Sequence, residues 1–123
     1  MDVDKQLDHS LLDHLAAMRA AFTSGRHEDV LKEFEQLAPL NTLRSGIRIE
    51  AIALAARTHL ASGDRKTARE LLKQIWEAPQ KSPRLYRYVA IACLEFGDYR
   101  RALSVMEKAI ALADASKPAP QQE

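Results

Sequence analysis

The sequence predicts an all-α fold in which six helices pair into three helical hairpins. Strong helix formers such as Ala, Leu, Arg, Lys and Glu dominate the chain, and no stretch alternates apolar and polar residues with the period of a strand. Gly25, Gly63 and Gly97 each end one segment of helical apolar periodicity and precede another. No proline interrupts these segments. Each of the three glycines therefore marks the turn of a hairpin.

The apolar spacing predicts helices over residues 8–23, 27–37, 43–61, 65–77, 83–96 and 99–114. Several of their ends carry capping signals. Asp64 and Asp98 follow two of the turn glycines, and their carboxylates can accept hydrogen bonds from the first N–H groups of the next helix. Ser82 supplies an N-cap oxygen before Pro83, which suits the first helical position.

The three turn glycines lie 38 and 34 residues apart, and similar residues recur at the same distances from each. Small residues recur where the two helices of a hairpin must approach closely: Ala90 faces Ala102, and Ala56 faces Ala68. Larger residues then fill the space between successive hairpins, namely Phe34, Leu72, Tyr86 and Met106. Because one hairpin cannot bury both of its faces, the three must stack.

This pattern resembles the tetratricopeptide repeat family, whose period is about 34 residues. The match is good over residues 83–114, fair over 49–78 and weak over 11–40. In the first unit, Met18 and Val30 stand where the family prefers small residues, so an irregular first hairpin is expected. The resemblance implies a right-handed α-α superhelix of three hairpins.

The repeat also sets the expected domain boundaries. The tetratricopeptide-like domain is expected to span 8–114, with hairpins at about 8–40, 41–80 and 81–114. Residues 1–7 are expected to form a flexible terminus, and 115–123 a disordered tail that lacks large apolar residues and contains two prolines. The four extra residues between the first two glycines are expected to lengthen the third helix near Ser45 and Gly46.

Composition excludes several classes of protein. Hydrophobic residues at 46% and charged residues at 28% are typical of a globular chain rather than a disordered one. No apolar run approaches the roughly 18 residues of a membrane span, and the first residues lack the features of a signal peptide. Cys93 is the single cysteine, which favours a reducing compartment. We therefore expect a cytoplasmic protein without membrane insertion.

Charge is balanced overall but uneven along the chain. Lys and Arg number 18 against 17 Asp and Glu, for a net charge of +1. Residues 1–40 hold 4 basic against 8 acidic residues, whereas residues 41–82 hold 8 against 4. A nucleic-acid binder of this size would carry a strong basic excess, so no nucleic-acid partner is expected. The basic middle either attracts an acidic surface locally or is an ordinary solvated helix face.

The resemblance implies a concave groove lined by the first helix of each hairpin, where peptides or partner helices bind. Counting back from the glycines assigns the groove to Leu15, Arg19, Phe22, Arg57, Leu60, Arg84, Arg87, Ile91 and Leu94. Glu50 and Glu95 fall on the same face. Arginine pairs bidentately with carboxylates, so the predicted partner is a protein or peptide segment with apolar and acidic residues. In the alternative, these apolar residues pack against the N-terminal segment or a second copy.

No catalytic constellation emerges, so we expect no enzyme activity, no cofactor and no metal. The chain lacks a phosphate-cradling glycine loop and a G-x-S-x-G turn. His9, Asp13 and His14 lie near one another on the first helix, but their spacing does not favour convergence on a metal. His59 and Cys93 occupy a core-facing position of the repeat and are expected to be packed. Trp76 is expected to anchor the core between hairpins.

The sequence thus predicts a non-catalytic protein–protein interaction module, an adaptor or a chaperone. Short arrays of three such hairpins resemble bacterial secretion chaperones, which wrap a subunit and keep it soluble before export. In the alternative, the chain is a structural homo-oligomer, because the last helix carries more apolar residues than one buried face requires. The predicted dimer surface consists of Leu103, Val105, Ile110 and Leu112.

Overall fold

The computed structural model describes residues 2–37 and 45–115, which form six α-helices and no strand. The helices are α1 (Asp2–Thr23), α2 (His27–Leu37), α3 (Ser45–Ala61), α4 (Arg65–Lys73), α5 (Pro83–Phe96) and α6 (Tyr99–Ala115). The predicted all-α class and the six predicted helices are confirmed. The tail predicted beyond Ala115 lies outside the described residues.

Two helix boundaries differ from the prediction by more than two residues. Helix α1 begins at Asp2, where a flexible terminus was expected, so its first six residues continue the helix backwards. Helix α4 ends at Lys73, and the following residues form tight turns, in which the N–H of Trp76 donates to the carbonyl of Leu72. Pro79 follows closely, and a proline disfavours helical geometry in the residue before it.

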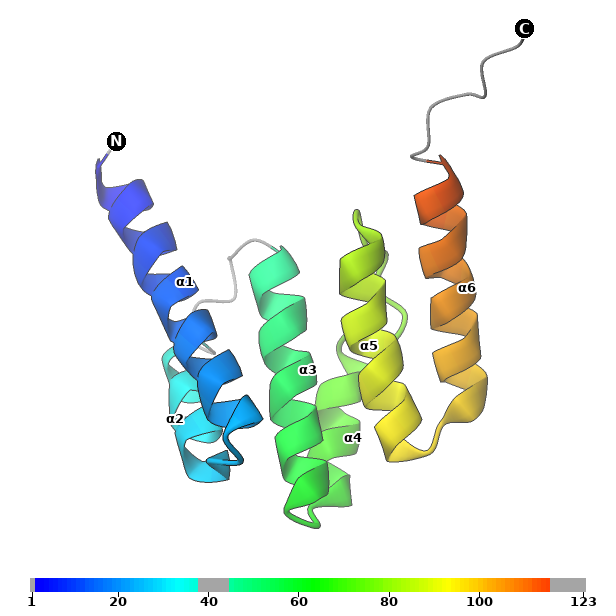
Figure 1. The fold of residues 1–123 in the computed structure, drawn as a ribbon, viewed down its shortest axis with the longest axis horizontal. Helices are drawn as coiled ribbons and strands as arrows, with labels where there is room; N and C mark the ends of the chain where they lie inside the picture. The colour runs from blue at the N-terminus through cyan, green and yellow to red at the C-terminus, as the bar shows by residue number, and fades with distance from the viewer. Residues whose placement is uncertain (1, 38–44, 116–123) are drawn as a thin grey trace, which may run out of the picture.

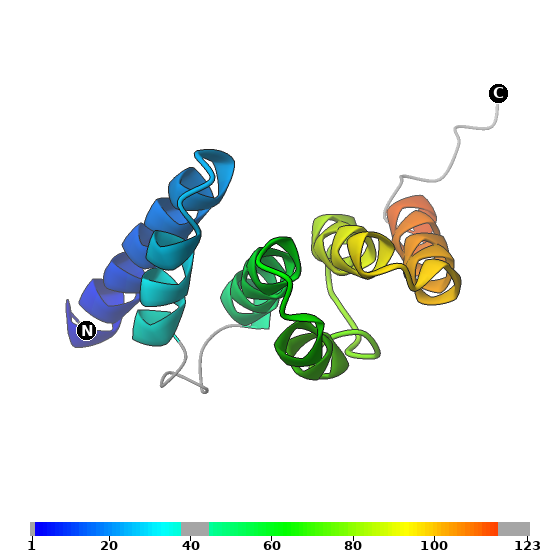
Figure 2. The same cartoon turned by 90° about the horizontal axis from the view of Figure 1, so that it is seen from below.

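The helices pair in chain order, α1 on α2, α3 on α4 and α5 on α6. Helix α3 also packs against both helices of the first pair, and α5 packs against both helices of the second. In Figure 1, α1, α3 and α5 run side by side; Figure 2 shows α2 and α4 beside them and α6 at the C-terminal end. In each of the first two pairs, both helices therefore contact the first helix of the next pair.

The three turns share one backbone geometry. The φ angle is 73° at Gly25, 86° at Gly63 and 97° at Gly97, in the left-handed region that favours glycine. In each turn, the residue after the glycine donates its N–H to the carbonyl four residues before the glycine: Arg26 to Ala21 at 2.9 Å, Asp64 to His59 at 2.8 Å and Asp98 to Cys93 at 2.9 Å. The three glycine turns that recur in the sequence thus share the same backbone hydrogen bond.

Two apolar clusters join successive pairs. One cluster holds α1 and α2 against α3, and the other holds α3 and α4 against α5 and α6. Phe34 and Leu71 pack against both clusters. Met18 and Val30, which replace the small residues of the family pattern in the first pair, are completely buried. The core is therefore continuous from the first pair to the last.

Of the three helix N-caps predicted from the sequence, two are formed and one is not. Asp64 accepts a hydrogen bond from the N–H of Thr67 at 3.1 Å, and Asp98 accepts one from Arg101 at 3.1 Å, as predicted. Pro83 is the first residue of α5, also as predicted, but the Ser82 side chain makes no capping hydrogen bond. The prediction that the Ser82 side-chain oxygen caps α5 is therefore wrong.

Candidate partner-binding face

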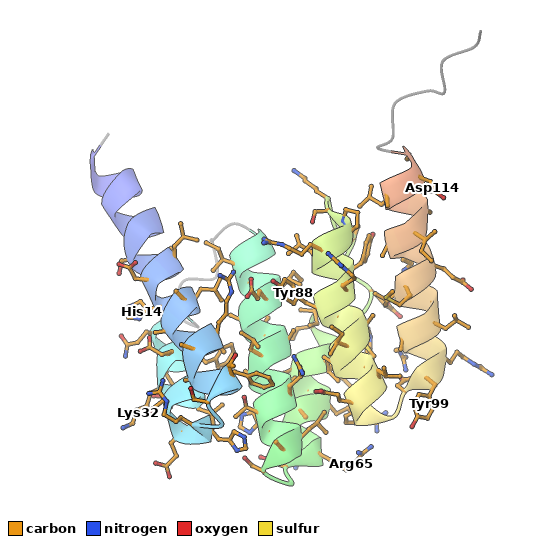
Figure 3. All side chains as sticks on the ribbon, viewed as in Figure 1. His14, Lys32, Arg65, Tyr88, Tyr99 and Asp114 are labelled. Carbon is orange, nitrogen blue, oxygen red and sulfur yellow. The ribbon has the colours of Figure 1, made fainter. Side chains whose placement is uncertain are left out.

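The predicted groove residues lie on α1, α3 and α5, and most of them share one face of these helices. This inner face carries the residues six and three positions before each turn glycine. The six-position residues are Arg19, Arg57 and Ile91, and the three-position residues are Phe22, Leu60 and Leu94. Figure 3 shows Tyr88 on the same side of the molecule, between α3 and α5.

Arg19 of α1 forms a two-point ion pair with Glu50 of α3. Its Nη2 donates to Oε1 of Glu50 at 2.6 Å, and its Nε donates to Oε2. Only 3% of the Glu50 side chain is exposed. Its hydrogen bonds to Arg19 raise the pKa of the guanidinium above its ordinary value. Arg19 therefore compensates a buried carboxylate of its own chain.

Arg57 of α3 makes the equivalent contact with α5. Its Nε and Nη2 donate to the two carboxylate oxygens of Glu95 at 2.6 and 2.9 Å. Its guanidinium also lies over the Phe22 ring of α1, 4.4 Å from the ring centroid. Arg57 thus ties together the first helices of all three pairs and is engaged on both sides.

The two arginines of α5 differ from Arg19 and Arg57 in their contacts. Arg84 and Arg87 are exposed, and within the described residues neither makes a hydrogen bond or an ion pair. Arg84 lies 5.9 Å from the centroid of the Tyr88 ring. On the same helix, Ile91 is 41% exposed and Leu94 is 53% exposed. The α5 part of the inner face therefore combines uncompensated positive charge with exposed apolar area.

Leu15 does not belong to this surface. It is 2% exposed and lies between Leu11 and Met18 on the buried stripe of α1, where it packs into the core shared with α2 and α3. Its assignment to the groove was wrong because the buried stripe of α1 passes through that position. Phe22 and Leu60 are half-buried, so they border the face rather than project from it.

The predicted dimer surface on α6 needs a similar correction. Leu103 and Ile110 are exposed, as expected, and Leu112 is half-buried. Val105 is 2% exposed, because it lies between Ala102 and Ala109 on the buried stripe of α6. Met106, assigned to the core from the sequence, is instead 37% exposed.

The ion pairs on the inner face were missed from the sequence. Glu50 and Glu95 were both placed on this face, but each contacts an arginine 31 or 38 residues earlier. One feature of the sequence could have predicted these ion pairs. Arg19 and Arg57 occupy equivalent positions of the repeat, and each shares the inner face with a glutamate of the next pair. Tyr99, the most exposed large hydrophobic side chain of α6, was also missed.

The two described histidines singled out from the sequence make structural contacts, and the cysteine is packed. Nδ1 of His14 lies 2.6 Å from Glu33 of α2, and Nδ1 of His59 lies 3.7 Å from Asp64. Cys93 is buried as predicted, and burial raises the pKa of its thiol to about 11. The His9 side chain is outside the described part of the chain.

Neither a metal-holding cluster nor a membrane-spanning helix is found in the described residues. Within residues 2–37 and 45–115, no three His, Cys, Asp or Glu side chains come together as a metal-holding group. The same part of the chain contains no helix with both the length and the apolar character to cross a bilayer.

A second basic surface lies along α4. Arg65 packs over Phe96 at 4.2 Å and donates to its carbonyl, and Arg101 packs over Trp76 at 3.7 Å. Trp76 is half-buried against the core, which agrees with its expected anchoring position. Arg65 joins α4 to α5, and Arg101 joins α6 to the turns that follow α4, so their aromatic partners are covered rather than offered to a ligand.

Comparisons with known proteins identify no relative: no protein-family model, no curated protein and no solved structure matches this chain.

Proposed function

We propose that this protein is a non-catalytic interaction module, an adaptor or a chaperone, that binds a segment of another protein on the α5 part of the inner face. The observation that carries the proposal is the contrast among its arginines. Arg19 and Arg57 are held by carboxylates of the chain, whereas Arg84 and Arg87 are exposed without such a partner among the described residues.

The wider arrangement that we propose is a right-handed superhelix of the tetratricopeptide type. The shared geometry of the three glycine turns supports it, as does the packing of α3 and α5 against both helices of the preceding pair. In such a superhelix the first helices of successive pairs line one curved wall, so α5 contributes the C-terminal part of that wall.

The residues of α5 indicate the chemistry of the partner. Arg84, Arg87, Ile91 and Leu94 are spaced by 3, 4 and 3 residues, so they form one stripe along the helix. The stripe is basic towards the N-terminal end of α5 and apolar towards its C-terminal end. An amphipathic helix with acidic residues at one end and large apolar residues at the other would match it. Balanced overall charge favours such a protein segment over a nucleic acid.

Charge reversal on α5 tests the proposal. We expect Arg84→Glu with Arg87→Glu to abolish capture of the partner from a lysate of the native host, while the circular-dichroism spectrum and Tm stay near wild type. Both side chains are exposed, so the fold does not depend on them. Arg57 is unsuitable for this test because its reversal would also break the contact with Glu95.

The matched control reverses two charges on α4. Lys66→Glu with Arg69→Glu changes the net charge by the same amount at exposed positions away from the inner face. Capture should survive in this variant. Equal loss of capture in both variants would show that net charge alone drives binding. Unchanged capture by the α5 variant would show that α5 is not the binding surface.

A further inference from the structure

Among the side chains that the structure describes, most of the large exposed hydrophobic ones lie on the last helical pair. Seven large hydrophobic side chains are exposed among the described residues, and six of them lie on α5 or α6. They are Ile91, Leu94, Tyr99, Leu103, Met106 and Ile110. The terminal unit of a stacked array normally presents a polar outer face to water. An apolar patch of this kind marks an interaction surface.

Four of these residues define the α6 stripe: Tyr99, Leu103, Met106 and Ile110. They follow one another at intervals of 4, 3 and 4 residues. This is the spacing of the a and d positions of a coiled coil, which meet one straight neighbouring helix along a single seam. The stripe is 37% to 69% exposed along its whole length, so it spans more than two helical turns of available surface.

The internal repeat shows what such positions do in the earlier pairs. The residues nine positions after the turn glycines are Phe34, Leu72 and Met106. Phe34 and Leu72 pack in the cluster that includes the first helix of the next pair. Met106 occupies the equivalent position, but no helix follows α6 in the described residues. At Met106, the α6 stripe therefore includes a position that receives a helix elsewhere in the array.

We propose that α6 of a second copy of this chain fills this surface, in an antiparallel pairing that closes a symmetric dimer. If the two-fold axis passes between Ser104 and Val105, Leu103 faces Met106 of the second copy, and Tyr99 faces its Ile110. The other two contacts follow by symmetry. Each residue of the stripe is then opposite another residue of the stripe, as a self-complementary interface requires.

Charges beside the stripe favour this occupant over an unrelated helix. Arg100 and Glu107 are both exposed, and each follows a stripe residue on the same side of the seam. In the antiparallel register, Arg100 lies next to Glu107 of the second copy, and Glu107 lies next to its Arg100. A parallel pairing would instead place Arg100 and Glu107 of the two copies on opposite sides of the seam, so they could not pair. The sequence of α6 is thus complementary to itself in one orientation.

The proposal is independent of the partner-binding function and is tested by molar mass. At about 50 μM, light scattering after size exclusion should give twice the 13.8 kDa of one chain. Leu103→Glu should halve the mass while leaving the circular-dichroism spectrum and the capture of the partner unchanged, because Leu103 is 63% exposed. The control Lys108→Glu, on the same helix away from the stripe, should remain a dimer. A wild-type monomer, or a dimeric Leu103→Glu variant, would overturn the proposal.

A charge swap tests the antiparallel register. Arg100→Glu and Glu107→Arg should each raise the dimer Kd by about tenfold or more, because either change places like charges opposite each other twice. Combining both substitutions should return the Kd to within about threefold of wild type. If the combined variant is as weak as the single ones, the antiparallel α6–α6 pairing is wrong.

Discussion

At the scale of single residues, Arg19 has a clear structural role because it is the partner of buried Glu50. Replacing Arg19 with Leu leaves a carboxylate that is 3% exposed without its two hydrogen bonds. We expect this change to lower the free energy of unfolding by about 2–3 kcal/mol, measured by urea denaturation.

The matched control removes both charges together. Arg19→Leu with Glu50→Leu should recover most of the lost stability, since apolar side chains can replace an ion pair at little cost. If Arg19→Leu alone changes stability by less than about 0.5 kcal/mol, the pair does not hold α1 on α3.

Residue-level predictions from the sequence failed where they required the buried face of a helix to be known. Leu15 was assigned to the groove by counting from the glycines, and Val105 to the dimer surface as one of the surplus apolar residues of the last helix, but both are buried. Counting fixes a position along a helix, whereas the choice of buried face depends on which helices pack against it. The pairs Arg19–Glu50 and Arg57–Glu95 were missed for the same reason, because they depend on how neighbouring helices are placed.

At the scale of elements, replacing a turn glycine with alanine should destabilise the protein, whereas the same change at the glycine within α3 should not. Gly63 has a φ of 86°, and a Cβ added there would meet no atom within 4 Å, so Gly63→Ala would be strained only by its backbone. We expect it to destabilise the protein by about 1–2 kcal/mol. Urea denaturation measures this loss.

Gly46 is the matched control. It lies in α3, and a Cβ added there would make an ordinary contact with Leu85 at 3.6 Å. We expect Gly46→Ala to leave stability unchanged or to raise it by about 0.5 kcal/mol. Equal effects at the two positions would contradict the assignment of Gly63 to a left-handed turn.

The helix caps make stability depend on pH in the acidic range. Hydrogen bonding to Arg101 holds the pKa of Asp98 below its ordinary value, and hydrogen bonds from Thr67 do the same for Asp64. A lowered native pKa stabilises the fold above the unfolded pKa of about 4, and this contribution is lost as the pH falls through the native value. Both caps therefore weaken at low pH.

Asparagine variants test this dependence, since asparagine can cap a helix but does not titrate. In thermal melts from pH 7 to pH 2.5, Asp64→Asn with Asp98→Asn should lose less Tm on acidification than wild type. A loss of Tm in the variant as large as that of wild type would show that these carboxylates do not contribute to the acid sensitivity.

Element boundaries were the most predictable part of the molecule. Apolar periodicity and the three turn glycines are local signals, and they placed α2 and α5 to the residue. The end of α4 at Lys73 was not predicted, because its last turn gives way to tight turns before Pro79. The start of α1 at Asp2 was not predicted either, because residues 2–7 carry little apolar periodicity.

At the scale of the whole molecule, repetition has two consequences. Each pair holds the first helix of the next, so the chain builds one continuous core from six helices of the described residues. The last pair has no successor among the described residues, which leaves apolar area on α5 and α6. The binding face and the α6 stripe that we propose both arise from this end of the array.

Site-specific photo-crosslinking shows whether α5 touches a partner protein. A benzoylphenylalanine is placed at Ile91, on the inner face, or at Lys66, on α4, and the chain is irradiated in a lysate of its native host. We expect the Ile91 position to form an adduct with a distinct partner protein and the Lys66 position to form none, and Arg84→Glu with Arg87→Glu should remove the Ile91 adduct. The same adducts at both positions, or none at Ile91, would show that α5 is not the binding surface.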